Sequence, residues 1–119
     1  MPVSLCAVGK ALLARLHDHD VDEMFPDGAE LPVLTPKSLR TGAALKAQLA
    51  EIREQGFAFE DEESTTGVVC LAVAVPTGSP RASLGLSVTA LKATYSEEQG
   101  ALMVKELKEL ARSLGNPMG

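Results

Sequence analysis

The sequence predicts one domain of the α+β class, in which helices flank an antiparallel sheet. Its 119 residues, 45% of them apolar and 23% charged, are enough for a single globular core. The stretch from Gly56 to Thr89 contains three strand-like segments, and two of them can pair across a turn. Segments with helical periodicity precede and follow this stretch.

The helices are marked by caps and by apolar stripes. The first is expected at Gly9–His17, the next from a Thr41 cap to Gln55 with Gly56 ending it, and the last from the capping box Ser96–Gln99. Three groups of apolar residues form the expected buried stripes: Leu12, Leu13 and Leu16; Leu45, Leu49 and Ile52; and Met103, Leu107, Leu110 and Leu114.

The three expected strands alternate between a bulky and a lean side. Phe57 and Phe59 begin the bulky side, which continues through Val68–Val75 and Ser83–Thr89. The opposite side, here called the small-residue face, consists of Ala58, Glu60, Val68, Cys70, Ala72, Ala74, Ser83, Gly85, Ser87 and Thr89. Such a surface either lies beneath a closely packed helix or forms the floor of a cavity. Its few polar groups favour a small-molecule cavity.

The overall charge argues against direct contact with nucleic acid. The net charge is −5 and the pI about 5.0, whereas a nucleic-acid backbone requires a clustered basic surface. No signal peptide and no run long enough to cross a bilayer is present. Cys6 and Cys70 are therefore expected as free thiols in a reducing cytoplasm.

A polar run at His17–Asp20 combines imidazoles and carboxylates, which are zinc ligands. The alternative is structural, because Asp20 with Glu23 has the form of a cap for a short helix at Val21–Phe25. We expect the cap and no metal site.

Two other charged features have ordinary interpretations. The start of the first helix, at Gly9, can attract an anion, but the simpler expectation is that Gly9 eases a turn and Lys10 is solvated. The acidic run Glu60–Glu63 is expected to be a solvated loop except for Glu60, which shares the face of Ala58.

Several short pieces of the sequence, in this order, resemble the effector-binding domain of IclR-type bacterial transcription regulators. The resemblance runs from about Val3 to Leu114. The pieces are Gly9–Ala14, Gly56–Ala58, Glu60–Glu63, Gly67–Ala72 and Leu86–Thr89.

The resemblance implies a GAF-like fold and a regulator that binds a small organic acid or aromatic carboxylate without transforming it. It implies no cofactor, and a ligand that lies against the sheet with its carboxylate near the start of the first helix. The implied contacts are Ala7, Val8, Glu60, Cys70, Ser87 and Thr89. The family's helix-turn-helix domain, linker helix and first effector-domain strands are not expected among residues 1–119, which would make the chain either a fragment of a regulator or a truncated relative. We therefore expect residues 1–119 to be an N-terminally truncated effector-binding domain that contacts DNA only through a helix-turn-helix absent from this chain.

Three functions compete. The first is a ligand sensor. The second is an enzyme with Cys70 as nucleophile, which needs a base such as His17 or His19. The third is a structural or dimerisation module, in which the helix at Thr41–Gln55 fills the small-residue face. An exposed strand edge also predicts a homodimer.

Overall fold

The structure is a computed structural model that describes residues 6–63, 65–75 and 84–115. Its elements, in chain order, are α1 (Ala7–Leu13), α2 (Asp18–Met24), α3 (Gly42–Gln55), β1 (Ala58–Asp61), β2 (Val68–Ala74), β3 (Gly85–Leu91), the 3₁₀ helix η2 (Lys92–Thr94) and α4 (Glu97–Gly115). The predicted α+β class is confirmed.

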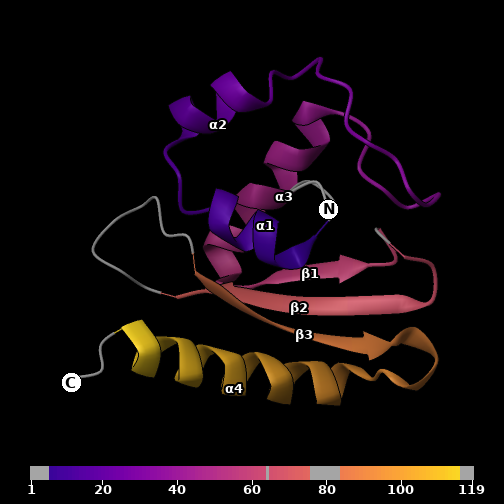
Figure 1. The fold of residues 1–119 in the computed structure, drawn as a ribbon, viewed down its shortest axis with the longest axis vertical. Helices are drawn as coiled ribbons and strands as arrows, with labels where there is room; N and C mark the ends of the chain where they lie inside the picture. Colours follow the sequence, from indigo (N-terminus) through magenta and orange to yellow (C-terminus); the bar gives the residue numbers. More distant parts are fainter. Residues whose placement is uncertain (1–5, 64, 76–83, 116–119) are drawn as a thin grey trace.

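The three strands form an antiparallel sheet in the order β1-β2-β3. Helix α4 lies along one side of this sheet, and α1 lies on the other side with α3 and α2 beyond it (Figure 1). The predicted pairing of the second and third strands is confirmed, with Cys70 opposite Thr89 and Ala72 opposite Ser87.

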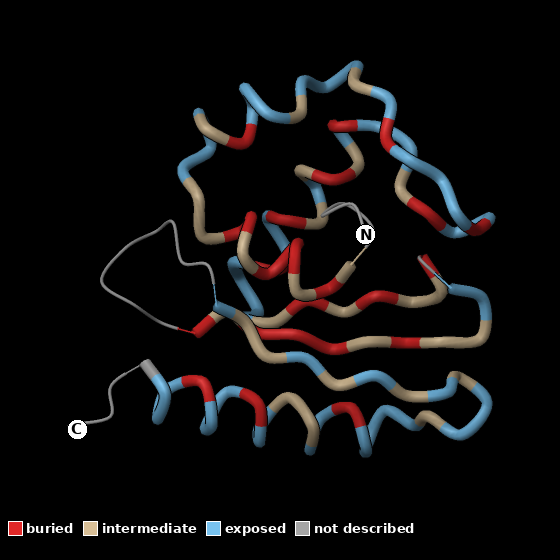
Figure 2. The backbone as a smooth tube through the Cα atoms, viewed as in Figure 1, coloured by how far each residue is buried: buried red, intermediate tan, exposed pale blue. Residues whose placement is uncertain are grey.

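Each side of the sheet has its own apolar core, and β2 is buried between them (Figure 2). Leu71, Val73 and Val75 pack with Leu107 and Ala111 of α4. The small-residue face contributes to the other core, which consists of Ala7, Ala11, Leu13, Ala14, Val21, Leu31, Leu45, Leu49, Ile52, Ala58 and Ala72. The alternation of bulky and small side chains along the strands therefore assigns them to the two cores on opposite sides of the sheet, as predicted.

Most of the predicted helix ends are confirmed by their hydrogen bonds. The Ala44 N–H donates to Thr41 Oγ1 at 3.2 Å, which caps α3. Gly56 ends that helix in the left-handed region, with φ of 83°. At α4 the Gln99 N–H donates to Ser96 Oγ and the Ser96 N–H donates to Gln99 Oε1, both at 3.2 Å.

Three expectations about the helices are wrong. Helix α1 begins two residues before Gly9. Helix α2 begins with His17 as a cap residue whose side chain makes no capping bond, so Asp20 does not cap it. On α4, Leu110 and Leu114 are 52% and 49% exposed, because the helix faces the sheet with Leu107 and Ala111 instead. A run of leucines marks an apolar helix but does not say how wide its buried face is.

Helix α1, and not α3, lies directly on the small-residue face. Ala7 and Ala11 are buried in the same cluster as Ala58 and Ala72, and side chains this small let the backbones approach closely. A Cβ added at Gly85 would lie 2.5 Å from Val8 Cγ2, so β3 also meets this helix at close range. The structural hypothesis was therefore wrong about which helix covers the face.

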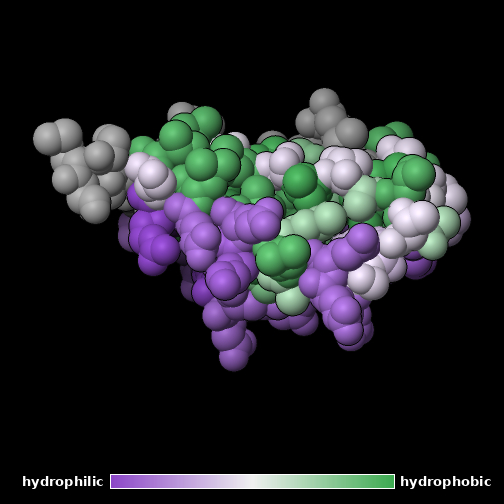
Figure 3. Space-filling view, turned by 90° about the horizontal axis from the view of Figure 1, so that it is seen from below, coloured by the Kyte–Doolittle hydropathy of each residue, from purple (hydrophilic) through white to green (hydrophobic). Residues whose placement is uncertain are grey.

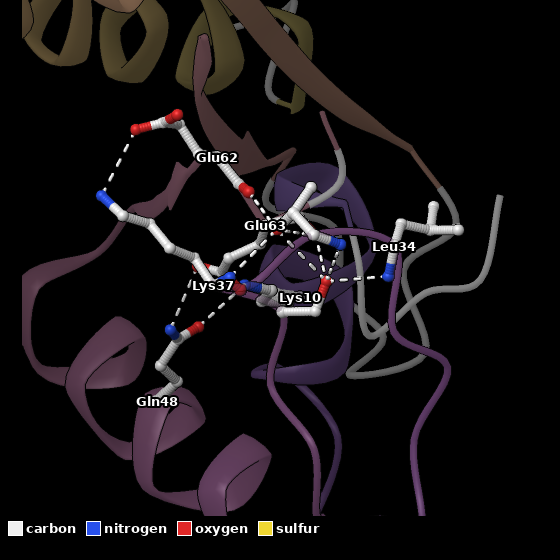
Figure 4. Close-up of polar contacts among 8 residues, drawn as sticks. Lys10, Leu34, Lys37, Gln48, Glu62 and Glu63 are labelled. Atoms are coloured by element: carbon white, nitrogen blue, oxygen red, sulfur yellow. Dashed lines mark hydrogen bonds and ion pairs between the residues drawn. The ribbon is translucent and has the colours of Figure 1, made fainter. Parts of the chain in front are cut away.

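A buried polar network fixes α1 in this place (Figure 4). Lys10 is 0% exposed and its ammonium is paired with the carboxylate of Glu63, which is 5% exposed. Lys10 Nζ also donates to Gln48 Oε1 of α3 at 2.9 Å, and Gln48 Nε2 donates to Glu63 Oε2 at 3.3 Å. The expectations that Lys10 and Glu63 are solvated are therefore wrong.

The long connection before α3 is bound to the same turn. The Ser38 hydroxyl donates to the Glu63 carbonyl and the Thr35 hydroxyl to the Glu62 carbonyl. The N–H groups of Leu34 and Thr35 donate to Ser38 Oγ, each at 3.1 Å. The end of β1 is thus tied both to this connection and, through Glu63, to α1 and α3.

The network predicts a strong, non-additive effect on stability. Lys10→Met should lower the free energy of unfolding by about 3–5 kcal/mol, because it leaves the Glu63 carboxylate buried without its cation. Adding Glu63→Met should recover most of that loss, since no buried charge remains. Urea unfolding followed by circular dichroism measures both values. Lys105→Met, at an exposed position of α4, is the matched control and should change stability little. Additive losses in the double variant would contradict this prediction.

Candidate functional site

The predicted site residues on the strands form a row across the sheet. Glu60 of β1 is directly opposite Cys70 of β2, and Cys70 is directly opposite Thr89 of β3. A second row on the same face consists of Ala58, Ala72 and Ser87, which are also directly opposite one another. Directly opposite residues have Cβ atoms about 4.5–5.5 Å apart, so these side chains are immediate neighbours on the small-residue face.

Exposure increases along this row from β1 to β3. Glu60 is only 4% exposed, Cys70 is half-buried, and Ser87 and Thr89 are exposed. Thr89 Oγ1 donates to Cys70 Sγ at 3.6 Å. The open end of the face therefore presents two hydroxyl groups, whereas its carboxylate lies inside the protein.

The two predicted residues of α1 lie beside this row. Ala7 is buried and Val8 half-buried in the first turn of the helix, and Val8 contacts the position of Gly85. The preceding residue, Cys6, is near enough to Cys70 to influence its ionisation. The structure therefore brings together all six residues that the resemblance implied.

The larger cavities of the described structure lie elsewhere. One, of about 720 Å³, lies between α3, β1 and α4 and is lined by Gln48, Glu51, Ile52, Gln55, Phe57, Phe59, Asp61, Glu63, Leu71, Tyr95, Glu97, Gly100, Ala101 and Val104. Two smaller cavities, of about 360 and 330 Å³, lie beside α3. None of the six predicted residues lines any of these three. Sequence reasoning missed the cavity of about 720 Å³, because its lining comes from separate segments of the chain.

The surroundings of Cys70 keep it in the thiol form. Burial raises the pKa of Cys70 above its usual value, and the nearby Glu60 and Cys6 raise it further, while hydrogen bonds from Thr89 and Ser87 act in the opposite direction. Neither histidine is among the groups that act on it. Both histidines are exposed, and His19 pairs with Glu23 at 3.2 Å. The structure therefore supplies Cys70 with no activating base.

Metal binding and membrane insertion also find no support in the described part of the chain. Among residues 6–63, 65–75 and 84–115, no three His, Cys, Asp or Glu side chains are placed to share a metal ion. No helix in these ranges has the length and apolar character needed to span a bilayer.

The raised pKa predicts a slow reaction of Cys70 with a disulfide reagent at neutral pH. Little of the group is thiolate at pH 7, because burial holds the pKa of Cys70 above that of an ordinary cysteine. In a Cys6→Ser background, labelling should be slower in the folded protein than in urea. Its rate should keep rising to a higher pH in the folded protein than in urea, since the folded state raises the pKa. Rapid stoichiometric labelling at pH 7 would contradict the assignment of Cys70 as an unactivated thiol.

The chain is similar to known proteins along its whole length. Residues 1–116 match the family model described as the C-terminal domain of the bacterial transcriptional regulator IclR. The transcriptional regulator XynR of Escherichia coli K12 is 33% identical over 98% of this chain and 48% of its own length. KdgR of the same organism is 32% identical, over 99% of this chain and 44% of its own length.

Solved structures give the same relationship. The Thermotoga maritima IclR superimposes with a TM-score of 0.90 at 26% identity, over 100% of this chain and 48% of that one. The C-terminal domain of E. coli KdgR superimposes with a TM-score of 0.88 at 31% identity, over 99% of this chain and 71% of that one.

The chain spans about half the length of the curated relatives it matches. These relatives are transcriptional regulators and not enzymes. The matched part is their C-terminal, effector-binding domain, and the predicted resemblance is confirmed. The chain belongs to the IclR family of bacterial transcriptional regulators.

Proposed function

We propose that residues 1–119 form the small-molecule sensing part of an IclR-type regulator and that the effector is a small organic acid. The observation that carries this proposal is the row of Glu60, Cys70 and Thr89, in which three strands bring side chains of different hydrogen-bonding capacity together on one face. The small side chains around the row leave this face without bulk of its own.

The chemistry of the row indicates what kind of effector fits. The hydroxyls of Ser87 and Thr89 can donate to a carboxylate, and they are exposed at the open end of the face. The carboxylate of Glu60, at the buried end of the row, accepts hydrogen bonds and would meet a hydroxyl group of an effector that enters beneath α1. Ala7 and Val8 would contact it from α1. A small hydroxy acid therefore matches the proposed site better than a plain hydrocarbon acid.

Helix α1 is the element through which binding would act. It lies against the small-residue face and carries two of the proposed contacts, so an effector that binds better to one position of α1 shifts the population toward it. In the proposed regulator a helix-turn-helix segment outside these residues reads this shift on DNA in the cytoplasm. The acidic charge of this chain leaves DNA contact to that segment.

The proposed site predicts selective loss of effector binding. Titration calorimetry with a panel of small aliphatic and aromatic hydroxy acids should identify a binder. The panel should include 3-hydroxybenzoate, which was present in a crystal of the Acinetobacter PobR inducer-binding domain. Ser87→Ala should weaken that binder about 3- to 10-fold, because one hydrogen bond to the carboxylate is lost. Cys70→Ser should also weaken it.

Ser113→Ala is the matched control, since it removes an exposed hydroxyl from the far end of α4. It should leave the affinity unchanged. An acid that binds with equal affinity to the wild type, Ser87→Ala and Cys70→Ser would place its site elsewhere and overturn the proposed one.

We propose further that two copies associate along β3 and the neighbouring flank of α4. Within the described residues β3 pairs only with β2, so its outer edge has no partner strand there. Leu84 and Leu91 at its two ends, and Leu102 and Leu110 on α4, are each more than half exposed. Figure 3 shows apolar side chains gathered along one long side of the face that carries α4, with hydrophilic ones along the other. An unpaired edge beside exposed leucines is a surface that pairs readily.

Self-association predicts a concentration-dependent dimer in sedimentation equilibrium. Leu102→Glu with Leu110→Glu should shift the equilibrium toward the monomer by at least about 10-fold, because the charges would have to be buried at the interface. Lys105→Glu adds acidic charge to the same helix without removing an exposed leucine and should shift the dimer equilibrium less. A wild-type monomer at the highest soluble concentration would contradict the proposed dimer.

A further inference from the structure

The cavity of about 720 Å³ lies at the β1 edge of the sheet, between α3 on one side of the sheet and α4 on the other (Figure 1). It is bounded by α3, the free edge of β1 and α4. Its volume of about 720 Å³ falls within the range of small-molecule sites, roughly 300–1,000 Å³. No residue of the proposed effector site lines it, so its occupant is a separate question.

The apolar part of its wall is aromatic. Phe57, Phe59 and Tyr95 all line the cavity, and the rings of Phe59 and Tyr95 stack with centroids 5.7 Å apart and an interplanar angle of 22°. Ile52, Leu71 and Val104 complete the apolar surface. Such a wall accepts the compact hydrocarbon body of a ligand, and its ring faces carry the partial negative charge that attracts cations.

The charged part of the wall is entirely acidic. The lining includes four carboxylates and no Lys or Arg: Glu51, Asp61, Glu63 and Glu97. Asp61 and Glu63 are already paired, Asp61 with Lys37 and Lys92 and Glu63 with Lys10.

The other two carboxylates remain available to a ligand. Glu51 of α3 and Glu97 of α4 are exposed, and neither forms a hydrogen bond or ion pair with another described residue. Glu97 lies near enough to Tyr95 to influence its ionisation. The cavity therefore has two carboxylates with unused capacity, one on each of the helices that bound it.

The chain already places one cation on this aromatic wall. Lys108 Nζ lies 5.6 Å from the centroid of the Phe57 ring and donates to the Gln55 carbonyl at 2.8 Å. This is a cation–π contact at the edge of the cavity, made by a primary ammonium. The chain itself therefore uses one ring of this wall for a contact with an ammonium group.

We propose that this cavity binds a small organic ammonium ion with a compact apolar body. The body lies against Phe57, Phe59 and Tyr95, and the ammonium is directed to Glu51 and Glu97. An organic acid is disfavoured beside Glu51 and Glu97, because these two carboxylates are the charged lining residues that no described lysine or arginine neutralises. The proposal is independent of the effector assignment, which concerns the row of Glu60, Cys70 and Thr89 and the opposite ligand charge.

The sequence supplies a reporter for the test. The chain has one tyrosine and no tryptophan, so its tyrosine fluorescence comes from Tyr95 in the cavity wall. Three probes share a saturated ring that does not absorb in the tyrosine range and differ in charge: cyclohexylmethylamine, cyclohexylmethanol and cyclohexanecarboxylate. Titration of each into the whole chain gives an affinity from the change in Tyr95 emission.

We expect the amine to bind at least about 5-fold more tightly than the alcohol, and the carboxylate most weakly. Glu51→Gln with Glu97→Gln should abolish the preference of the amine over the alcohol while leaving alcohol binding in place. Glu109→Gln, which removes an exposed acid of α4 outside the cavity, is the matched control and should preserve the preference. Equal affinities for all three probes in the wild type, or a preference that survives the double variant, would overturn the assignment of a cation site.

A second variant tests the location. Ala101→Phe places a ring in the cavity from an exposed position of α4 and should abolish binding of both the amine and the alcohol. The smaller Ala101→Leu, whose fold is checked by circular dichroism, should weaken both probes. Cys70→Ser on the opposite face should change neither. Binding that is unaffected by both changes at Ala101 would place the probes outside the cavity and refute the proposal.

Discussion

The buried pair between the Lys10 ammonium and the Glu63 carboxylate is the interaction on which the rest of this structure depends. Helix α1 has seven residues, too few to be stable as an isolated helix, so tertiary contacts must hold it in place. A buried charge is tolerated only where its partner is correctly placed, and Gln48 completes this arrangement from α3. The pair therefore favours this position of α1 over the sheet.

That position gives the two faces of the sheet different chemistry. On the α1 side, hydroxyl groups of β3 are the exposed polar groups, which suits an acceptor such as a carboxylate. On the α4 side, the cavity wall combines aromatic rings with carboxylates, which suits a cation. Gln48 and Glu63 belong both to the network around Lys10 and to the wall of the cavity, so the two sides share residues through the end of β1.

Local rules in the sequence predicted the features that depend on neighbours along the chain. The alternation in β2 and β3 predicted both faces and their pairing, and the caps at Thr41 and Ser96 are formed by residues three positions apart. The burial of Lys10 was not predictable in this way. Its partners lie 38 and 53 residues away, and only the folded chain brings them together.

The large cavity escaped sequence reasoning for a related reason. Its wall combines α3, β1 and α4, and none of these segments alone has the pattern of a binding motif. The error at Leu110 has a different cause. An apolar stripe shows which side of a helix can be buried. The number of layers that pack against that side determines how many residues of the stripe are buried. One sheet buries Leu107 and Ala111 and leaves Leu110 half exposed.

A sheet surface of small side chains can lie beneath a closely packed helix or form the floor of a cavity. In this sheet, one part of the small-residue face is covered by α1 and another part is exposed. Seven helical residues extend only about 10 Å, so α1 covers only part of the sheet: it contacts all three strands but meets β3 at Gly85, the first residue of that strand. Ala58 and Ala72 lie fully beneath it, whereas Ser87 and Thr89 on the third strand remain exposed. Cys70 is half-buried because it lies at the boundary. The short length of α1 is therefore what leaves the hydroxyl end of the face accessible to a ligand.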